Sequence, residues 1–344
     1  MGTDFDNGIT DLNLEDIARL SGVSRSTVSR VVNHHPNVSE ITRRKVLEII
    51  ERYNFKPHPA ARALASQRAN IIGILIPHIV SDLFTDPFFS ILLQGITTAA
   101  NSVNYSPILW LTSANVDESA FYDQVFNDRL ADGMIVASAT VNASFIKRLD
   151  QRGKPYIIIG RPFTAYEQSS YVDSENEQGA RMMVEHLIKQ GRRRIGMITG
   201  RSGLTSSHDR LQGYISALQH ADIPIDMRLI TPAGDYSDAS GYTGMKLLLH
   251  HRIDAVFAAN DVMAASAMRA IKEAGLRIPE DIAIGGFDDM GISRTTEPQL
   301  TTVQQPITQL GDYAVRGLID LLEGRVEPPF QQMLPVKLIV RQST

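Results

Sequence analysis

The chain has 344 residues, and 43% of them are hydrophobic, which suffices for two or three domains with sizeable cores. It has no cysteine, which excludes disulfide frameworks, thiolate metal sites and cysteine nucleophiles. The first ten residues are polar and acidic, and the longest apolar run, at residues 71–77, is far too short to span a bilayer. We therefore expect a cytoplasmic protein without a signal peptide.

The net charge of -4 conceals a basic segment near the N-terminus. Between Arg19 and Arg68, ten Lys or Arg residues face three acidic residues, so this segment carries +7 and the remainder carries -11. A compact basic module on an acidic body suggests a polyanionic partner for the module. A solvated helix face is the alternative explanation for such a charge run.

Residues 12–56 are predicted to form a helix-turn-helix domain of three short helices. Gly22 tolerates a positive φ and Ser24 is a natural N-cap, so the first two helices are separated by a tight turn. The second helix covers residues 24–33, and Ser39 caps the third at residues 41–55. Apolar residues recur at helical spacing in all three helices, namely Leu14, Ile17, Ala18, Leu20, Val28, Val31, Val46, Ile49, Ile50 and Tyr53.

Residues 57–69 form a candidate hinge. The segment is rich in alanine and favours helix, but isolated helices shorter than about 12 residues are marginal in water. Leu64 is its only large apolar side chain. We expect a helix that forms only when another surface contributes contacts, with an inert linker as the alternative.

Residues 70–344 show the alternation of short apolar strands and amphipathic helices that is typical of α/β folds with doubly wound parallel sheets. Strands are predicted at residues 71–77, 105–111, 132–138, 155–160, 194–200, 228–234, 255–260 and 282–288. This is more than one sheet usually takes, so we expect two lobes. Lobe 1 is expected at residues 70–162 and 307–328, and lobe 2 at residues 163–306 and 329–344.

Two stretches, "LEDIARLSGVSRSTVSRVVN" and "VSEITRRKVLEIIERYNFKPHPAARALAS", closely resemble the DNA-binding end of the lactose-repressor (LacI/GalR) family. The remainder resembles that family's regulatory core, which is similar to periplasmic sugar-binding proteins, through "RLQGY", "AANDVMAASAMRAIKEAGLRIPEDIAIGGFDD" and "LTTVQQP". The resemblance covers almost the whole chain. It implies a homodimeric transcriptional repressor that binds operator DNA and a small-molecule effector, without a cofactor, a metal or a membrane partner.

The resemblance places a recognition helix in the major groove, beginning at Ser24. Arg25 lies in its first turn and Arg30 one turn further along the same face, where a guanidinium can make a bidentate contact with guanine or bind a phosphate instead. Leu64 matches a leucine that enters the minor groove when the hinge is helical. The candidate DNA-binding residues are Asn13, Ser24, Arg25, Ser26, Thr27, Ser29, Arg30, Asn33, Asn37, Ser39, Thr42 and Leu64, some of which could be helix caps only.

The resemblance also implies an effector site between the lobes. The candidate residues are Asp86, Phe88, Arg161, Ser206, Arg210, Tyr236, Asn260 and Asp288. Planar aromatic groups beside charged groups suit a polyhydroxy ring, so a sugar or its phosphate is expected. The alternatives are an ion pair between Arg210 and Asp288 within one lobe, and core packing for Phe88 and Phe89. Asp173 and Asn176 fit turn and helix-cap chemistry better than ligand binding.

Three other functions deserve comparison with a sugar-controlled repressor. An enzyme is disfavoured, because Ser207, His208 and Asp209 are consecutive and their side chains diverge, and the histidine pairs at 34–35 and 250–251 lack metal-ligand spacing. A free-standing sugar-binding protein would leave the basic module unexplained. A repressor with a nucleobase or nucleoside effector stays open, as does the choice between inducer and corepressor. The chain shows no leucine-heptad tail after the last expected strand, so we expect a dimer.

Overall fold

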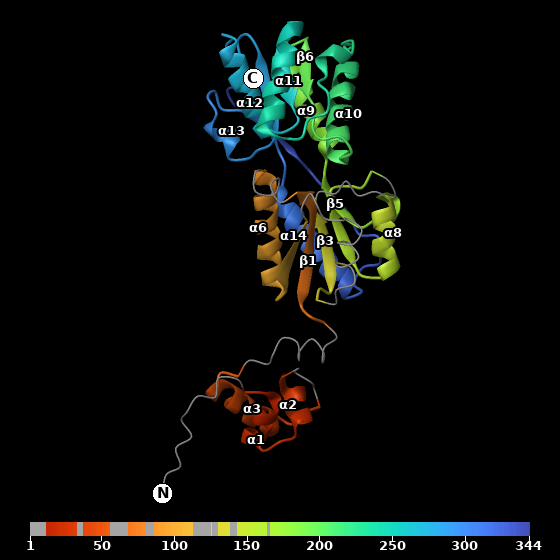
Figure 1. Cartoon of the computed structure of the whole chain (residues 1–344), viewed down its shortest axis with the longest axis vertical. Coiled ribbons are helices and arrows are strands. Elements are labelled where there is room, and N and C mark those ends of the chain that lie inside the picture. The colour runs from red at the N-terminus through yellow and green to blue at the C-terminus, as the bar shows by residue number, and fades with distance from the viewer. Residues whose placement is uncertain are drawn as a thin grey trace. The chain divides into compact units, whose positions relative to one another are not determined.

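The structure is a computed structural model that describes residues 12–32, 37–55, 68–79, 86–112, 125, 130–137, 143–163 and 166–344. It divides into two compact units, Met1–Ile71 and Ile72–Thr344 (Figure 1). Residues 57–67 of the expected hinge, including Leu64, lie outside the described residues, as does Asn33.

The first unit contains the expected helix-turn-helix. Asn13 begins the first helix with a capping box, in which its side chain accepts the backbone N–H of Asp16 and the Asp16 side chain accepts that of Asn13. Gly22, at φ 64°, ends this helix. The helices are α1 (Leu14–Ser21), α2 (Arg25–Val32) and α3 (Glu40–Arg52), and they close over a core of Ile17, Ala18, Val28, Val31, Val46 and Phe55.

The apolar stripe of the third helix is shorter than the sequence predicted. Val46 is buried, whereas Tyr53 is 41% exposed and lies just beyond the end of α3. The backbone N–H of Phe55 donates a hydrogen bond to the Ile50 carbonyl at 2.9 Å, which turns the chain back over the helix end. Phe55 therefore fills the place in the core that the spacing had assigned to Tyr53.

The second unit contains two sheets. In the first sheet, the described strands follow the order β10-β5-β4-β3-β1-β2. They are β1 (Ile71–Ile79), β2 (Ser106–Thr112), β3 (Gly133–Ala137), β4 (Tyr156–Ile159), β5 (Tyr171–Ser174) and β10 (Gln331–Leu334). Buried residues alternate between the two faces. One face packs on α6 (Pro87–Ser102) and α14 (Ile307–Leu322), and the other on α8 (Ala143–Arg152) (Figure 1).

In the second sheet, the described strands follow the order β11-β9-β8-β7-β6, and only β11 is antiparallel to its neighbour. They are β6 (Ile195–Ile198), β7 (Ala255–Ala258), β8 (Ala283–Asp288), β9 (Thr301–Gln304) and β11 (Lys337–Ile339). Helices α9 (Asn176–Lys189) and α10 (Thr205–His220) cover one face, and α11 (Asp238–Leu248) and α12 (Asp261–Glu273) cover the other (Figure 1). Short helices are η1 (Tyr166–Gln168), η2 (Met227–Leu229), η3 (Leu249–His251) and α13 (Ile292–Thr295).

Two sequence predictions about the second unit are wrong. No strand forms at residues 228–234: η2 ends at Leu229, and Ile230 and Gly234 make only isolated bridges, because Pro232 cannot donate to a ladder. The lobe boundaries also move, because β5 and β10 both belong to the first sheet. Lobe 2 therefore begins after Ser174, and lobe 1 extends to Leu334.

Within residues 166–344, all of which are described, the chain crosses between the lobes at three places. These are Glu175, residues 305–306 and residues 335–336. The first and third crossings lie side by side, since the backbone N–H of Glu175 donates to the Leu334 carbonyl at 3.0 Å. None of the described helices is long and apolar enough to cross a lipid bilayer.

Candidate functional site

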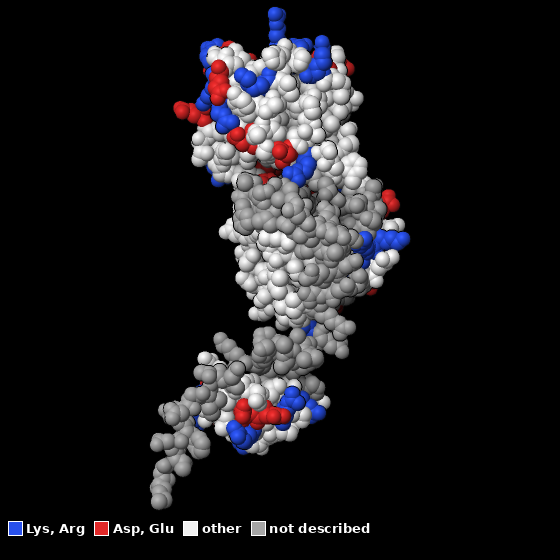
Figure 2. All heavy atoms as spheres, viewed as in Figure 1, with Lys and Arg blue, Asp and Glu red and all other residues white. Residues whose placement is uncertain are grey.

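The recognition helix α2 presents two accessible guanidinium groups. Arg25 and Arg30 are both exposed, and among the described residues neither forms an ion pair. Ser26 is exposed beside them, and Thr27 and Ser29 are half-buried. On the face of this unit that Figure 2 shows, acidic atoms lie between two groups of basic atoms, so the basic excess is unevenly distributed.

Several candidate DNA-binding residues act as helix caps in the structure. Asn13 caps α1, Ser24 accepts the backbone N–H of Thr27 at 3.2 Å, and Ser39 accepts that of Thr42 at 3.3 Å. The Ser39 hydroxyl also donates to the Thr42 hydroxyl at 2.8 Å. Asn37 is exposed before α3. Capping, the alternative raised by the sequence, is thus present, and it fixes the positions of these polar side chains.

A cavity of about 520 Å³ lies between the two lobes of the second unit. All eight predicted effector-site residues line it. Several of its walls come from the carboxyl ends of parallel strands: Arg161 follows β4, Asn260 follows β7 and Asp288 ends β8. Ligands of open α/β sheets usually bind at this edge.

Arg210 and Asp288 form an ion pair inside lobe 2. Their side chains are each 5% exposed, and Arg210 Nη2 lies 3.5 Å from Asp288 Oδ1. The Arg210 guanidinium also donates to Asn176 Oδ1 at 3.0 Å and to the Ala259 carbonyl at 2.5 Å, and it stacks over Phe287 at 3.7 Å. The ion pair within one lobe, which the sequence analysis gave as an alternative, is therefore present, and both of its residues also line the cavity.

Asp288 occupies a strained backbone conformation, with φ 110°. Its carboxylate accepts a hydrogen bond from Gln305 Nε2 at 2.9 Å, which joins it to the second crossing between the lobes. Burial raises the pKa of Asp288 well above the ordinary aspartate value, although the Arg210 guanidinium opposes this shift. The loop that holds Asp288 must therefore be fixed by its surroundings.

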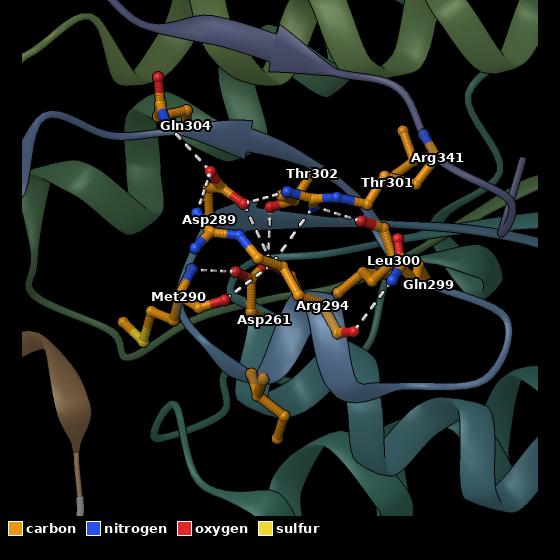
Figure 3. Close-up of polar contacts among 12 residues, drawn as sticks. Asp261, Asp289, Met290, Arg294, Gln299, Leu300, Thr301, Thr302, Gln304 and Arg341 are labelled. Carbon is orange, nitrogen blue, oxygen red and sulfur yellow. Dashed lines mark hydrogen bonds and ion pairs between the residues drawn. The ribbon is translucent and has the colours of Figure 1, made fainter.

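A buried network next to the cavity supplies this fixation (Figure 3). The carboxylate of Asp289, at φ 56°, accepts hydrogen bonds from Arg341 at 2.6 Å, Arg294 at 3.1 Å and Gln304 at 3.0 Å. The carboxylate of Asp261 accepts the backbone N–H of Met290 at 2.7 Å. Each of these aspartates directly follows a cavity-lining residue, Asn260 or Asp288, so buried anchors hold both neighbours in place.

The Tyr236 wall is held by its own contacts within lobe 2. The Tyr236 hydroxyl lies 2.6 Å from Ser207 Oγ and 3.5 Å from Ser206 Oγ. Asn260 donates to the Tyr236 carbonyl at 3.2 Å while its oxygen caps α12. Tyr236 therefore presents a positioned aromatic ring to the cavity. The hydrogen bonds of the Asn260 side chain are structural, because they hold the Tyr236 backbone and the start of α12.

Arg161 connects the two lobes across one end of the cavity. Its Nη2 donates to both carboxylate oxygens of Asp209 in α10, at 3.0 and 2.8 Å. Its backbone N–H donates to Asp173 Oδ2 at 2.9 Å. Asp173, expected only to cap a turn, also lines the cavity, and burial raises its pKa to about 6.

Lobe 1 also lines the cavity with residues at the start of α6. The Asp86 side chain caps this helix by accepting the backbone N–H of Phe88 at 3.0 Å. Phe88 is half-buried, and Phe89 is buried in the core and meets Phe88 edge to face at 5.5 Å. Both rings line the cavity while packing against lobe 1, so core packing is present and ligand contact stays a prediction.

Comparison with known proteins places these features in a family. Residues 13–58 match the bacterial regulatory proteins of the lacI family, and residues 184–344 match the periplasmic binding protein-like domain. The HTH-type transcriptional regulator CelR of Thermobifida fusca is 34% identical over 96% of this chain and 97% of its own length. The chain belongs to the LacI family.

Solved structures of relatives agree with both units. A transcriptional regulator CelR–cellobiose complex is 32% identical, has a TM-score of 0.77 and covers 97% of this chain and 100% of that one. A lac repressor dimer bound to operator and the anti-inducer ONPF is 28% identical, has a TM-score of 0.84 and covers 97% and 99%. As a member of this family, the protein is a DNA-binding transcriptional regulator.

Some lining residues were missed by the sequence analysis. They are Arg201, Leu204, Thr205, Asp235, Ser237, Asp238, Ala239, Val262, Gln305 and Leu310, together with Ile159, Gly160 and Asp173. Asp235 is the neighbour of Tyr236, so its proximity to a predicted residue was an available signal. Gln305 had no such signal, because it lines the cavity through its position at the second crossing between the lobes, which the structure defines.

The consecutive Ser207, His208 and Asp209 diverge as expected. Ser207 contacts Tyr236, the His208 ring meets Phe163 edge to face at 5.4 Å, and Asp209 binds Arg161. Such diverging partners do not form a catalytic triad. Among the described residues, no group of three or more His, Cys, Asp or Glu is arranged to hold a metal ion.

Proposed function

We propose that this protein is a repressor that binds operator DNA as a homodimer and that a sugar bound between the lobes controls its operator affinity. One observation carries the proposal: the cavity brings together all eight residues that the sequence assigned to an effector, and it draws them from both lobes. A relative in the same family has been solved in complex with cellobiose. The arrangement requires no catalytic group.

The cavity offers a physical route from ligand to DNA. A ligand that contacts Phe88 of lobe 1 and Tyr236 of lobe 2 contributes free energy that depends on how the lobes are oriented. Lobe 1 begins directly after residues 57–69, the proposed hinge, so its orientation would set where the hinge ends. The coupling is reciprocal: operator changes ligand affinity by the same factor as ligand changes operator affinity.

The DNA-binding part is tested with an operator selected from a random DNA pool by the purified full chain. Arg25→Ala or Arg30→Ala should cost about 1 to 3 kcal/mol of operator affinity if the arginine contacts a guanine, and should relax the preference at one base pair. Equal losses on all sequences would assign a phosphate contact instead.

Arg19→Ala is the matched control, because Arg19 is an exposed arginine of α1 that pairs with Asp16 at 3.0 Å. It removes the same charge outside the recognition helix. Full operator affinity in both the Arg25 and Arg30 variants would contradict the assignment of α2 as the recognition helix.

Screening nucleosides and purines beside sugars for a change in operator affinity tests the competing effector class.

A further inference from the structure

The cavity is lined by more acidic than basic side chains, which is unfavourable for binding an anion. Five carboxylates and three guanidinium groups line it among the described residues, namely Asp86, Asp173, Asp235, Asp238 and Asp288 against Arg161, Arg201 and Arg210. The lining is therefore negative on balance. An anionic ligand entering it would meet like charges where water is largely displaced, and such repulsion is strong at low effective dielectric.

Each of the three arginines also lies beside a carboxylate. Arg210 pairs with Asp288, and Arg161 pairs with Asp209. Burial raises the pKa of Asp235, but hydrogen bonds from Ser237 and Ser240 and the nearby Arg201 outweigh this, so its pKa is lowered. The guanidinium charges are thus already compensated by the protein.

The lining favours a ligand that donates hydrogen bonds. Ionised carboxylates only accept, and sugar hydroxyls both donate and accept. Both oxygens of the buried Asp173 already accept hydrogen bonds, Oδ2 from the Arg161 backbone and Oδ1 from the Ser174 backbone and Asn176. Asp86, at the start of α6, lines the cavity and is half-buried. The aromatic rings of Tyr236 and Phe88 supply apolar walls for the faces of a sugar ring.

Asp209 affects the charge of the cavity although it lies outside the cavity lining. It does not line the cavity itself, but its side chain, 9% exposed, holds both hydrogen bonds from the cavity-lining Arg161, which is 29% exposed. It comes from α10 of lobe 2, whereas Arg161 follows β4 of lobe 1. Asp209 therefore neutralises the charge of Arg161 at a contact between the two lobes.

We propose that the cavity selects an uncharged, hydroxyl-rich ligand over phosphorylated or carboxylated analogues, and that Asp209 sets this selectivity by neutralising Arg161. This inference rests on the proposed effector role of the cavity. It narrows that role, because a sugar phosphate is no longer an expected effector.

The test measures binding of matched ligands to the full chain by calorimetry. The panel holds glucose, glucose 6-phosphate and glucuronate, ribose and ribose 5-phosphate, and cellobiose and cellobionate. At least one neutral sugar should bind, and its anionic analogue should bind about tenfold or more weakly, the factor that about 1.4 kcal/mol of repulsion gives. An anionic analogue that matches its parent, or a panel without a neutral binder, would overturn the proposal.

Three variants separate charge from geometry. Asp209→Asn keeps the size of the side chain but leaves the charge of Arg161 uncompensated. The gap in affinity between a neutral sugar and its anionic analogue should therefore shrink several-fold. Arg161→Met breaks the same bridge without leaving a surplus cation and should keep the gap. Asp281→Asn changes the net charge equally at an exposed pair with Arg277, outside the cavity, and serves as the control.

A gap that shrinks equally in Asp209→Asn and Arg161→Met would mean that loss of the inter-lobe bridge, not charge, controls selectivity, and the proposal would fail. An unchanged gap in Asp209→Asn would also overturn it. The proposed repressor function fails separately: neutral sugars would then bind with the stated selectivity but leave the affinity for the selected operator unchanged.

Discussion

The two units place their candidate functional side chains in opposite environments. In the helix-turn-helix unit, Arg25 and Arg30 stand exposed on a short helix, and the core beneath them is apolar. In the second unit, Arg210 and Asp288 are buried within an ion pair and also line the cavity. The difference teaches that the proposed DNA contacts can be altered with little effect on folding, whereas the proposed effector contacts are also structural.

The same contrast holds for buried polar groups. Among the described residues of the first unit, Ser21 is the only buried polar side chain, and it donates to the Ile17 carbonyl at 2.6 Å. The second unit buries charged groups at several positions, including Asp173, Asp209 and Asp261. Each must keep its partners, because an unpaired buried charge costs several kcal/mol.

Removing the buried arginine should give the largest effect. Arg210→Met leaves Asp288 buried without its counter-charge, so the free energy of unfolding of the second unit should fall by about 3 to 5 kcal/mol. Urea unfolding followed by the fluorescence of Trp110, the single tryptophan, reports on this unit. A loss within the range of an exposed pair, about 0 to 1 kcal/mol, would contradict the contrast between the units.

The double variant Arg210→Met with Asp288→Asn is the control for this prediction. It removes both charges, so it should recover part of the lost stability. In the single variant, the folded state should bind a proton at Asp288 because the counter-charge is gone, and stability should then fall as pH rises above the unfolded pKa of Asp288 near 4. The loss should accordingly be smaller at pH 5 than at pH 8.

Asp261 should give the next largest effect, through pH. Burial raises its pKa from 3.8 to about 7, partly offset by hydrogen bonds from Thr302 and the Met290 backbone. The folded state therefore binds more protons than the unfolded state, and stability present below pH 4 is lost as pH rises towards 7. Between pH 5 and 7 the Asp261 contribution should be about 2 kcal/mol, measured by urea unfolding at each pH.

Asp261→Asn is the matched variant for this measurement. It cannot titrate, so its stability should fall less steeply between pH 5 and 7 than that of the original protein. The buried Asp173 and Asp288 stay in the variant and shift stability in the same direction, so a residual slope is expected. Identical slopes in both proteins would show that Asp261 does not titrate in this range.

The smallest effect should come from a cap in the first unit. Asn13→Ala removes the capping box of α1, and the free energy of unfolding of this unit should fall by about 1 kcal/mol. Thermal unfolding followed by far-ultraviolet circular dichroism should show an earlier loss of helix, with the Trp110 transition unchanged. A shift of the Trp110 transition would mean that the two units do not unfold independently.

The sequence predicted those features that depend on neighbours along the chain. The spacing of Ile17, Val28 and Val46 was enough to predict the three helices, and motifs around Arg210 and Asp288 identified residues that the structure brings together at one cavity. Their individual roles in ligand binding stay a proposal.

Features that depend on distant pairing were not predictable. Strand β5 has four residues and a charged Asp173, so it lacks a strand-like pattern, and its membership of the first sheet follows only from its pairing with β4 and β10. The bridge between Arg161 and Asp209 joins positions 48 residues apart, and no local spacing indicates such a contact.

The last residues of the chain belong to both lobes, and this has a consequence for biosynthesis. Strand β10 pairs with β5 in lobe 1 and β11 pairs with β9 in lobe 2, while Ser343 bridges Ile284 and Thr301. A nascent chain that still lacks residues 331–344 therefore leaves β5 of lobe 1 and β9 of lobe 2 each without one of its neighbouring strands. Neither sheet reaches the strand order seen in the structure until residues 331–344 have been synthesised.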